Sequence, residues 1–486
     1  MLKNQIQLIT YPDSLGGNLN QLHTLLYKHF KEAVGGVHIL PFYPSSSDRG
    51  FCPLTYDTVD PNFGGWNDIQ KISKDFELAA DFIPNHISSE SKYFQDYKLH
   101  GSKSQYADLF LQIRKVFPKG RIPVSDLSKI YLRKQSSPEH RIQFPDKSYD
   151  YLWQTFESDL QIDLDVNSDT YKKIFGEFLK FLCAQGVKLI RLDAVGYVIK
   201  KAGTSCFMIE PEVWNFLDWV KQEVAEFDTD LLIEIHSYYK DQLNIATKGY
   251  WVYDFCLPFL TLNALQSSES KYLVDWLKIC PATQVTTLDT HDGIPVEDVK
   301  GLLPQNEIEK TANKVLANGG NVNYNYSSDG TKVMYQLDIT YFSALEENEQ
   351  AYLLARAIQL FTPGVPQVYY VGALAGKNDL EALDKFTGIK EGGWSRDINR
   401  HNYTTEEVEK EVERPIVKKL FELMSFRNQC QAFNGKMTVN GKGEQLNILW
   451  ILKNKDKTES TAELKANLAT YEFTVTSDKG TIVTQI

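Results

Sequence analysis

Long hydrophobic runs are missing from this sequence. No stretch approaches the roughly 18 consecutive apolar residues that a membrane-spanning helix needs, and the first residues, MLKNQIQLITYPDSLGG, include no apolar segment of signal-peptide length. An excess of basic residues is missing as well, since the formal net charge is −11. A nucleic acid or an anionic membrane would require a basic surface. We therefore expect neither partner, and we expect a cytoplasmic protein that acts on a small molecule.

Two classes of motif are also absent. The six cysteines are scattered and form no CxxC pair, which predicts free thiols in a reducing compartment. Neither GxxxxGK(S/T) nor GxGxxG occurs, so a phosphate group would not be held by a glycine-rich loop. With 486 residues, 42% of them hydrophobic and 24% charged, the composition indicates one large globular domain with smaller additions.

Strand-like and helix-like segments alternate along most of the chain, which predicts a parallel sheet with crossover helices. The expected strands are residues 5–10, 36–44, 79–86, 188–195, 231–237, 249–258, 284–292 and 364–371. The expected helices lie around residues 18–33, 66–75, 171–186, 212–227, 239–247, 262–280, 349–361 and 415–429. Eight strands with their helices predict an α/β fold, a (β/α)₈ TIM barrel.

The alternation is interrupted twice and stops before the end of the chain. Residues 87–165, rich in Tyr, Lys, Asp, Ser and Pro, predict an inserted subdomain, and residues 293–340 predict a second insertion. Short alternating segments over residues 433–486 predict a small C-terminal antiparallel β domain. The catalytic barrel would then comprise residues 1–86, 166–292 and 341–432.

Polar residues stand where several expected strands end: Asp81, Asn85 and His86, then Arg191 and Asp193, then Glu234 and His236, and finally Asp289, His291 and Asp292. A single Asp at a strand end most often caps a turn. In a closed parallel barrel, however, the carboxyl ends of the strands meet on one face, and repeated buried acids are costly. Two carboxylates on either side of a glycosidic bond can act as nucleophile and general acid.

The segments DFIPNH, RLDAV, IEIH and LDTHD, in this order and spacing, resemble the four signature regions of the α-amylase superfamily. Longer segments extend the resemblance to the family of sucrose phosphorylase and its glucoside phosphorylase relatives over nearly the whole chain: QLITYPDSLG, GGVHILPF, GTSCF, PGVPQVYYVGALAGKNDLEAL and RDINRHNY. The four regions alone indicate the superfamily, and the longer segments are more specific. The resemblance implies a retaining glycosyltransferase without a metal ion or an organic cofactor.

The resemblance also implies roles for individual residues. Asp193 would be the nucleophile, Glu234 the general acid and base, and Asp292 the acid that binds sugar hydroxyls and stabilises the transition state. The sugar-binding residues would be Arg191, His86, His291 and Gln336, the stacking walls Phe51, Phe156 and Tyr197, and the pair that closes the far side Asp48 and Arg396. Taken singly, each His or aromatic residue could equally be part of the core.

Phosphate would be bound by residues from the two insertions, and the candidates are Arg133, Lys134 and Tyr335. An Arg can bind phosphate through two hydrogen bonds, whereas a Lys acts as a point charge. The alternative is that Arg133 and Lys134 form an ordinary solvated pair. Relatives that act on sucrose 6′-phosphate carry His at the place of Tyr335, so this residue favours plain sucrose. The segment FTGIKEGGWSRDINR is longer before Arg396 than is usual in the family, which would alter access to the pocket.

The resulting hypothesis is a phosphorylase that converts sucrose and inorganic phosphate into α-D-glucose 1-phosphate and D-fructose through a covalent glucosyl-enzyme. Alternatives are a phosphorylase of glucosylglycerol or sucrose 6′-phosphate, a sucrose hydrolase or transglucosidase, and a catalytically silent sugar-binding barrel. The three intact acids speak against the silent barrel. Asn85 stands where calcium-binding amylases place a ligand, yet the resemblance implies no ion. A monomer and a homodimer are both compatible with the sequence.

Overall fold

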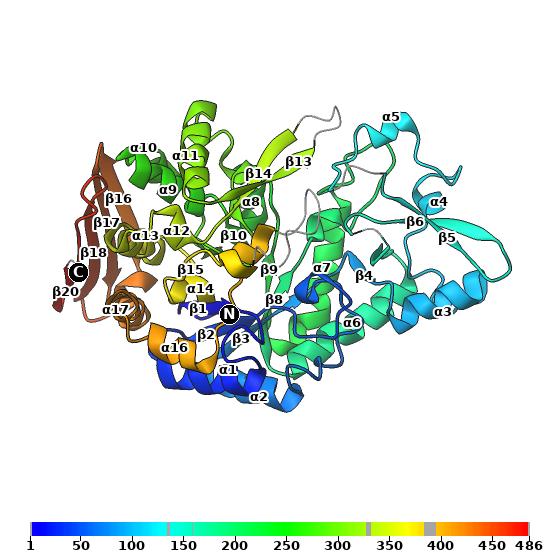
Figure 1. Cartoon of the computed structure of the whole chain (residues 1–486), viewed down its shortest axis with the longest axis horizontal. Helices are drawn as coiled ribbons and strands as arrows, with labels where there is room; N and C mark the ends of the chain where they lie inside the picture. Colours follow the sequence, from blue (N-terminus) through cyan, green and yellow to red (C-terminus); the bar gives the residue numbers. More distant parts are fainter. Residues whose placement is uncertain (1, 134–136, 158, 327–331, 383–394, 485–486) are drawn as a thin grey trace.

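Eight parallel strands close into a barrel at the centre of the molecule (Figure 1). The computed structural model describes residues 2–133, 137–157, 159–326, 332–382 and 395–484. In order around the barrel, the strands are β1 Gln7–Thr10, β2 Gly36–Ile39, β3 Glu77–Phe82, β8 Val187–Leu192, β9 Asp230–Ile233, β10 Trp251–Asp254, β11 Gln284–Thr286 and β15 Val365–Tyr369. Each overlaps one of the predicted strands, so the predicted (β/α)₈ fold is confirmed.

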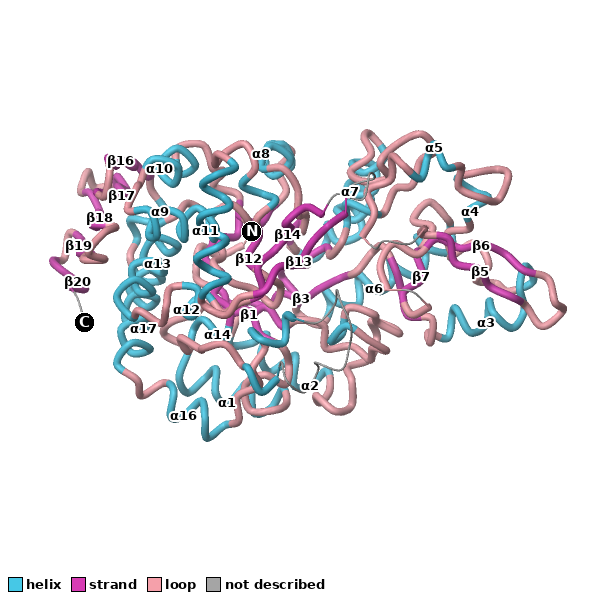
Figure 2. Tube along the Cα trace, turned by 45° about the horizontal axis from the view of Figure 1, so that its top comes forward, coloured by secondary structure: helices cyan, strands magenta, loops and turns pink. Residues whose placement is uncertain are grey.

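Helices connect the strands and cover the outside of the barrel (Figure 2). They are α1 Leu19–Leu25, α2 Trp66–Asp75, α6 Asp169–Ala184, α7 Glu212–Val224, α8 Tyr239–Thr247, α9 Leu257–Ser267, α10 Lys271–Leu277, α12 Tyr341–Ala344, α13 Glu349–Phe361, α14 Tyr370–Ala373, α16 Thr405–Glu411 and α17 Pro415–Gln429. Several begin at a polar cap. The side chain of Ser168 accepts the N–H of Tyr171 at 3.0 Å, and that of Asn348 accepts the N–H of Ala351 at 2.9 Å.

The single helix predicted over residues 262–280 is wrong. The chain forms α9 and α10 there, and Ser268 between them has a left-handed backbone with φ of 56°. A left-handed residue ends a helix because it turns the next N–H groups away from the helical pattern. The apolar periodicity continues across this break, which is why the sequence indicated one helix.

The strand predicted over residues 284–292 ends early, with β11 at Thr286. Beyond it, the side chain of Asn399 donates to the carbonyl groups of Thr290 and Asp292, at 3.4 and 3.0 Å. The carbonyl groups of Thr290 and Asp292 therefore have a side-chain hydrogen-bond donor in place of a neighbouring strand. The segment that contains them can then leave the sheet and turn over the top of the barrel.

Two groups of elements interrupt the barrel, and a sheet follows it. The first group is β4 His86–Ser88, α3 Lys92–His100, α4 Ile113–Val116, α5 Val124–Leu127, β5 Glu139–Gln143, β6 Tyr149–Trp153 and β7 Gln161–Asp163. The second is β12 Ile294–Pro295, α11 Gln305–Ala317, β13 Asn321–Tyr326 and β14 Lys332–Asp338. The five-stranded antiparallel sheet is β16 Lys436–Lys442, β17 Gln445–Lys453, β18 Glu459–Asn467, β19 Phe473–Ser477 and β20 Gly480–Thr484. In Figure 1 this sheet and the first group lie on opposite sides of the barrel.

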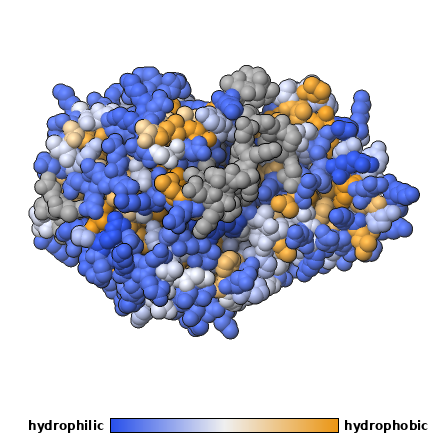
Figure 3. Space-filling view, in the orientation of Figure 1, coloured by the Kyte–Doolittle hydropathy of each residue, from blue (hydrophilic) through white to orange (hydrophobic). Residues whose placement is uncertain are grey.

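The inside of the barrel is a packed core beneath the strand ends. Its members are Leu2, Ala79, Leu189, Leu232, Tyr253, Phe255, Val285 and Val365, all buried. Burying one large aliphatic side chain contributes about 1.5–3 kcal/mol, so this core gives the polar strand ends a rigid base. The face of the molecule in Figure 3 is mostly hydrophilic with small separate hydrophobic areas. Among the described residues, no helix has both the length and the apolar character to cross a membrane.

Candidate active site

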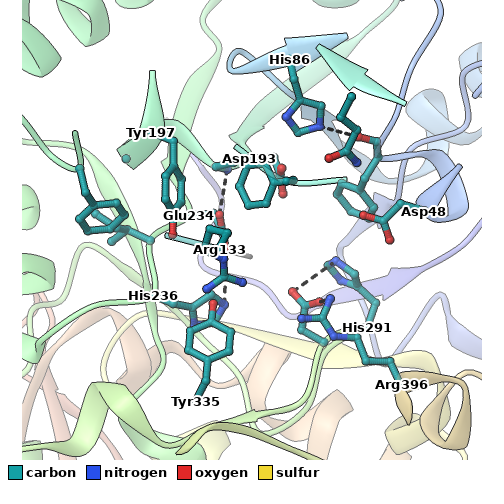
Figure 4. A pocket seen from close by; sticks show the side chains of 18 of the residues that line it. Asp48, His86, Arg133, Asp193, Tyr197, Glu234, His236, His291, Tyr335 and Arg396 are labelled. Atoms are coloured by element: carbon teal, nitrogen blue, oxygen red, sulfur yellow. Dashed lines mark hydrogen bonds and ion pairs between the residues drawn. The ribbon is translucent and has the colours of Figure 1, made fainter. Parts of the chain in front are cut away.

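A pocket of about 130 Å³ opens at the carboxyl ends of the barrel strands, where the loops of successive strands meet. It continues into an outer hollow of about 320 Å³ that shares part of its lining. The pocket is lined by Asp48, Phe51, His86, Arg133, Phe156, Gln161, Asp193, Ala194, Gly196, Tyr197, Phe207, Glu234, Ile235, His236, His291, Asp292, Tyr335, Arg396 and Arg400. Figure 4 shows many of these side chains arranged around one central space.

Asp193 stands directly after β8 and is held by Arg191 of the same strand. Nη1 of Arg191 donates to Asp193 Oδ1 at 2.7 Å and to Asp81 Oδ1 at 2.5 Å. Asp81 also pairs with Nε2 of His38 at 2.7 Å. Arg191, Asp81 and His38 are all buried, so water screens their charges little. Burial raises the pKa of Asp193 well above its usual range, Arg191 opposes that shift, and Glu234 adds to it.

Glu234 follows β9, the neighbour of β8 in the barrel. Its Oε2 accepts the backbone N–H of Ala194 at 2.9 Å, and its Oε1 lies 3.8 Å from Nη2 of Arg191. Ala194 has a left-handed backbone, with φ of 53°. The turn that follows β8 therefore holds the Glu234 carboxylate, which follows β9, by a backbone hydrogen bond. One guanidinium contacts both predicted catalytic carboxylates, and its contact with Asp193 is the shorter one.

Asp292 lies in the segment after β11 and has a cationic partner. Its Oδ1 pairs with Nη1 of Arg396 at 2.5 Å. Although burial would raise it, the pKa of Asp292 is held well below its usual range, chiefly by Arg396. The neighbouring His291 has Nε2 at 3.6 Å from Asp292 Oδ2. Burial lowers the pKa of His291 to about 3, so this imidazole is neutral at neutral pH.

Asp48 lines the pocket together with Arg396 and Arg400, and Figure 4 shows Asp48 and Arg396 on the same side of it. Burial raises the pKa of Asp48 to about 6, and the charges of Arg400 and Arg396 oppose the shift. The resemblance places Asp48 and Arg396 together as the pair that closes the pocket. In the structure both line it, and the ion pair of Arg396 is with Asp292.

Aromatic rings form the walls of the pocket. Phe51 is stacked on His291, with ring centroids 4.9 Å apart and planes 7° apart. The Phe156 ring lies 5.1 Å from that of Tyr197 and 5.4 Å from that of His86. Nε2 of His86 is 2.9 Å from the carbonyl oxygen of Phe51, so this histidine is bonded to the backbone and also lines the pocket. The three predicted stacking residues thus lie around one space.

Arg133 brings a cation to the pocket from the first insertion, and the second insertion holds it. Its guanidinium carbon lies 4.4 Å from the centre of the Tyr335 ring, and Nη1 donates to Asn325 Oδ1 at 3.2 Å. Segments about 200 residues apart therefore meet around the predicted phosphate cation. Lys134 lies outside the described residues, and so do residues 383–394, which include most of the longer segment before Arg396.

Two predicted site residues, Arg191 and Gln336, lie behind the lining and contact residues that form it. Oε1 of Gln336 accepts from Nη2 of Arg396 at 3.0 Å, and its Nε2 lies 3.4 Å from Nε2 of His236. His236 is 3.3 Å from Glu234 through the same Nε2. Although burial acts in the opposite direction, Asp298 raises the pKa of His236, which favours an imidazolium beside Glu234.

Sequence reasoning missed some residues of the pocket. His236 was noted at a strand end without a role, and Arg400, Gln161 and Phe207 were not singled out. Nε of Arg400 donates to the carbonyl oxygen of His291 at 2.9 Å, so it holds the backbone next to Asp292. A contact to a backbone carbonyl leaves no signal in a sequence, because every residue carries that group.

A metal ion does not suit the centre of this pocket. Among the described residues, Glu234, His236 and Asp292 offer ligand atoms that lie within 4.8 Å of one another. Arg396 already pairs with Asp292, and Asp298 favours the protonated form of His236. A metal ion requires a neutral imidazole as ligand, and the guanidinium would repel it.

The position beside Asn85 is also taken by a cation of the protein itself. Nζ of Lys200 lies 2.6 Å from Asn85 Oδ1 and 2.5 Å from Asp163 Oδ2. Lys200 and Asp163 have side chains that are 1% and 0% exposed, so the pair is desolvated. The ammonium joins the strand end that carries Asn85 to the first insertion, and it leaves a divalent ion there without free ligands.

Comparison with known proteins agrees with this geometry. A family model described as the catalytic domain of alpha-amylase matches residues 29–278. The chain belongs to the α-amylase family. It is 46% identical to sucrose phosphorylase from Streptococcus mutans, covering 99% of this chain and 98% of that protein. It is 44% identical to sucrose 6(F)-phosphate phosphorylase from Thermoanaerobacterium thermosaccharolyticum, covering 98% and 97%.

Solved structures agree as well. A crystal structure of sucrose 6F-phosphate phosphorylase from Thermoanaerobacter thermosaccharolyticum superposes with a TM-score of 0.94 at 42% identity, covering 100% of this chain and 98% of that one. The resemblance to the glucoside phosphorylases of the α-amylase family is therefore confirmed over the whole chain. As a member of this group, the chain is an enzyme of the phosphorylase type, which transfers a glycosyl group.

Proposed function

We propose that this protein is a sucrose phosphorylase, which converts sucrose and inorganic phosphate into α-D-glucose 1-phosphate and D-fructose with retention. The observation that carries the proposal is the presence of Arg133, stacked on Tyr335, in the same pocket as three carboxylates. The carboxylates supply what glycosyl transfer requires, and the guanidinium supplies a partner for phosphate. A hydrolase would need the carboxylates alone.

In the first half of the reaction, Asp193 attacks the anomeric carbon of the glucosyl unit while the bond to the fructosyl oxygen breaks. Glu234 gives its proton to that oxygen, so fructose leaves as a neutral alcohol and a glucosyl ester stays on Asp193. Arg191 supports this division of roles, because its closer contact with Asp193 favours the negative charge there.

In the second half, an oxygen of phosphate attacks the anomeric carbon, and the ester bond to Asp193 breaks. Glu234, now a carboxylate, accepts a proton from phosphate and returns to its starting form. Asp292, kept ionised by Arg396, stabilises the positive charge that develops on the sugar in both steps. Two inversions at the anomeric carbon give the α-configured product.

Phosphate competes with water for the glucosyl-enzyme, and the protein decides the outcome by positioning. Arg133 and the imidazolium favoured at His236 provide positive charge on the side of the pocket that the leaving fructose vacates. Their attraction for a dianion raises its local concentration, an advantage that water, as a neutral nucleophile, does not receive. We expect phosphorolysis to exceed hydrolysis for this reason.

Sucrose 6′-phosphate is the second candidate substrate. The outer hollow carries Arg133, Arg396 and Arg400 against two acids, Asp48 and Glu157, a surplus of positive charge that suits a phosphorylated acceptor. Tyr335 lies against Arg133 and lines the same pocket with a neutral aromatic ring, which favours an unphosphorylated fructose in the inner position. Glucosylglycerol is a third donor to compare.

The deciding experiment incubates the purified protein with sucrose, with and without phosphate, and measures glucose 1-phosphate and free glucose. We expect glucose 1-phosphate as the main product and little glucose when phosphate is omitted. Release of glucose at the same rate without phosphate would contradict the proposal. The same assay with sucrose 6′-phosphate and with glucosylglycerol ranks the donors by kcat/KM, and we expect sucrose to rank first.

No cofactor enters this mechanism, since every step uses side chains of the chain itself.

We place the reaction in the cytoplasm. The six cysteines, all free thiols, support a reducing compartment. Size-exclusion chromatography with light scattering distinguishes a monomer from a homodimer.

A further inference from the structure

The backbone that presents Asp48 to the pocket is strained. Asp48 and Arg49 both have left-handed angles, with φ of 52° and 47°, and Gly50 follows with φ of 106°. A left-handed backbone is unfavourable for residues other than glycine, above all for a long side chain such as Arg. Strain of this kind persists only where the surrounding structure imposes it, and it gathers at functional sites. The direction of the Asp48 carboxylate therefore depends on what holds Arg49.

Arg49 is anchored outside the pocket. Its guanidinium carbon lies 4.1 Å from the centre of the Tyr11 ring, and Nη2 donates to Asp13 Oδ1 at 2.7 Å. Both partners belong to the segment that follows β1. Arg49 lines a separate hollow of about 280 Å³, and Asp48 lines both this hollow and the active pocket. Of the two consecutive residues, Asp48 therefore reaches the active pocket and Arg49 does not.

The rest of the loop is fixed on either side of these two residues. The hydroxyl of Ser47 donates to Glu157 Oε2 at 2.6 Å, which ties the loop to the first insertion. On the other side, a Cβ placed on Gly50 would lie 2.5 Å from the carbonyl oxygen of Pro41, so the backbone passes tightly against the end of β2.

We propose that Arg49 is a positioning residue for the glucose side of the pocket. By stacking on Tyr11 and pairing with Asp13, it holds the left-handed backbone that turns the Asp48 carboxylate into the pocket. The inference rests on the proposed function, in which Asp48 accepts hydrogen bonds from glucose hydroxyls. Without the anchor, the two residues return to ordinary angles and the carboxylate leaves its place. Arg49 does not line the pocket, so it acts through Asp48.

A double-mutant cycle tests this inference. Arg49→Met keeps a linear side chain and removes both anchoring contacts. We expect it to lower kcat/KM for sucrose by about tenfold to a hundredfold, the usual cost of misplacing a substrate-binding group. The loss is the same with glucose 1-phosphate as donor in the reverse reaction, because both donors place the same glucose in the pocket. In an Asp48→Asn background, Arg49→Met causes no further loss.

The matched control is Arg121→Met. Arg121 has the same two kinds of contact, with Nη2 at 2.9 Å from Glu139 Oε2 and its guanidinium carbon 4.5 Å from the Tyr151 ring centre, but it lines no part of the pocket. We expect its kcat/KM to be unchanged. Arg49→Lys, which restores the charge beside Asp13 without the planar stack, should recover part of the activity. A general folding defect would lower the melting temperature of Arg49→Met. An unchanged melting temperature, together with the partial recovery in Arg49→Lys, therefore indicates a positioning role.

Three results would overturn the inference. The first is an equal loss from Arg49→Met in the native and Asp48→Asn backgrounds, because Arg49 would then act independently of Asp48. The second is an Arg49→Met variant with native kcat/KM when Asp48→Asn alone lowers kcat/KM. An Asp48→Asn variant with full kcat/KM would contradict the sugar-binding role of Asp48 and the inference with it. The phosphorylase assignment is judged separately, by whether the native protein forms glucose 1-phosphate from sucrose.

Discussion

The inner and outer parts of the pocket are built in different ways. In the inner part, Asp193 and Glu234 follow neighbouring strands of one barrel. The N–H of Asp193 donates to the carbonyl oxygen of Phe82, and the N–H of Ala194 donates to the Glu234 carboxylate. In the outer part, Arg133, Tyr335 and Arg396 come from three segments that share no sheet with the barrel. The difference teaches that strand register places the catalytic acids, whereas side-chain packing between loops places the acceptor side.

Side chains placed by strand register and side chains placed by loop packing differ in how well they keep their position when one contact is lost. A strand of the barrel is bonded on both sides, so a side chain at its end keeps its place when one contact is lost. A loop side chain such as Arg133 is held by contacts with the rings of Tyr335 and Phe156 and with the amide of Asn325. Substitutions in the inner part should therefore change the chemistry, and those in the outer part should change the choice of acceptor.

The largest effect is expected from Asp193→Asn in the inner part. The amide is nearly isosteric, but it cannot form the glucosyl ester, so kcat for glucose 1-phosphate formation should fall by about 10⁴-fold or more. Circular dichroism should show an unchanged fold, and Asp146→Asn at an exposed turn serves as control. Activity within tenfold of native would show that the nucleophile lies elsewhere.

The structural support beneath the inner part of the pocket is tested by Arg356→Met on α13. Nη2 of Arg356 is bonded to both oxygens of Asp289, at 2.8 and 2.6 Å, in a buried site that precedes His291 and Asp292. Removing the guanidinium leaves a buried carboxylate without its cation, which costs about 3–5 kcal/mol of unfolding free energy. Urea denaturation measures the loss.

Gly372→Ala tests the same ion pair of Arg356 and Asp289 by adding a methyl group next to it. The added Cβ would lie 1.9 Å from Arg356 Nη2 and 2.3 Å from Asp289 Oδ2, so we expect this variant to be destabilised as well. Arg121→Met, at a pair in the first insertion whose guanidinium is exposed, should change the unfolding free energy much less. Equal stability of all three variants would mean that the buried pair has no role in holding the segment.

A smaller and more selective effect is expected from Arg133→Gln in the outer part. Loss of the cation should raise KM for phosphate by about 10- to 100-fold, since one charged hydrogen-bonding partner is worth about 1.5–3 kcal/mol. Hydrolysis of sucrose without phosphate should change little, because the inner carboxylates stay in place. The control is Arg141→Gln, whose guanidinium stacks on Tyr149 at 4.5 Å on an exposed strand. An unchanged phosphate KM would remove Arg133 from the acceptor site.

The smallest effect is a change in pH dependence at Asp48, where the two parts meet. Its pKa is raised to about 6, so the carboxylate becomes protonated as the pH falls through 6 and binds sugar hydroxyls less well. The kcat/KM for sucrose should decline there, and Asp48→Asn should lose this inflection. A raised carboxyl pKa means that the folded state binds the proton more tightly, so its contribution to stability falls as the pH rises from about 4 to 6. A native profile without an inflection near 6 would contradict this assignment.

Much of the inner part could be predicted from the sequence. The strand-end positions of Asp193 and Glu234 follow from hydrophobic runs that stop at an acid, and the closed barrel brings them together with Asp292, which lies beyond the end of β11. From the sequence, Arg133 was one candidate cation of the insertions, with an ordinary solvated pair as the alternative. The pairing of Arg396 with Asp292 and the bond from Arg400 to His291 were not foreseen, because loop packing has no periodic pattern.

The sequence by itself determined the fold class, the eight strands and the acids at their ends, since local hydrophobic periodicity and strand ends are properties of neighbouring residues. Only the tertiary structure decided which cation meets which carboxylate, where α9 stops, and that Arg49 and Asp48 lie in strained backbone. Several of these features arise from contacts between segments far apart in the chain, such as the ion pair of Arg396 and Asp292. Such contacts depend on packing in three dimensions, which the local order of residues does not encode.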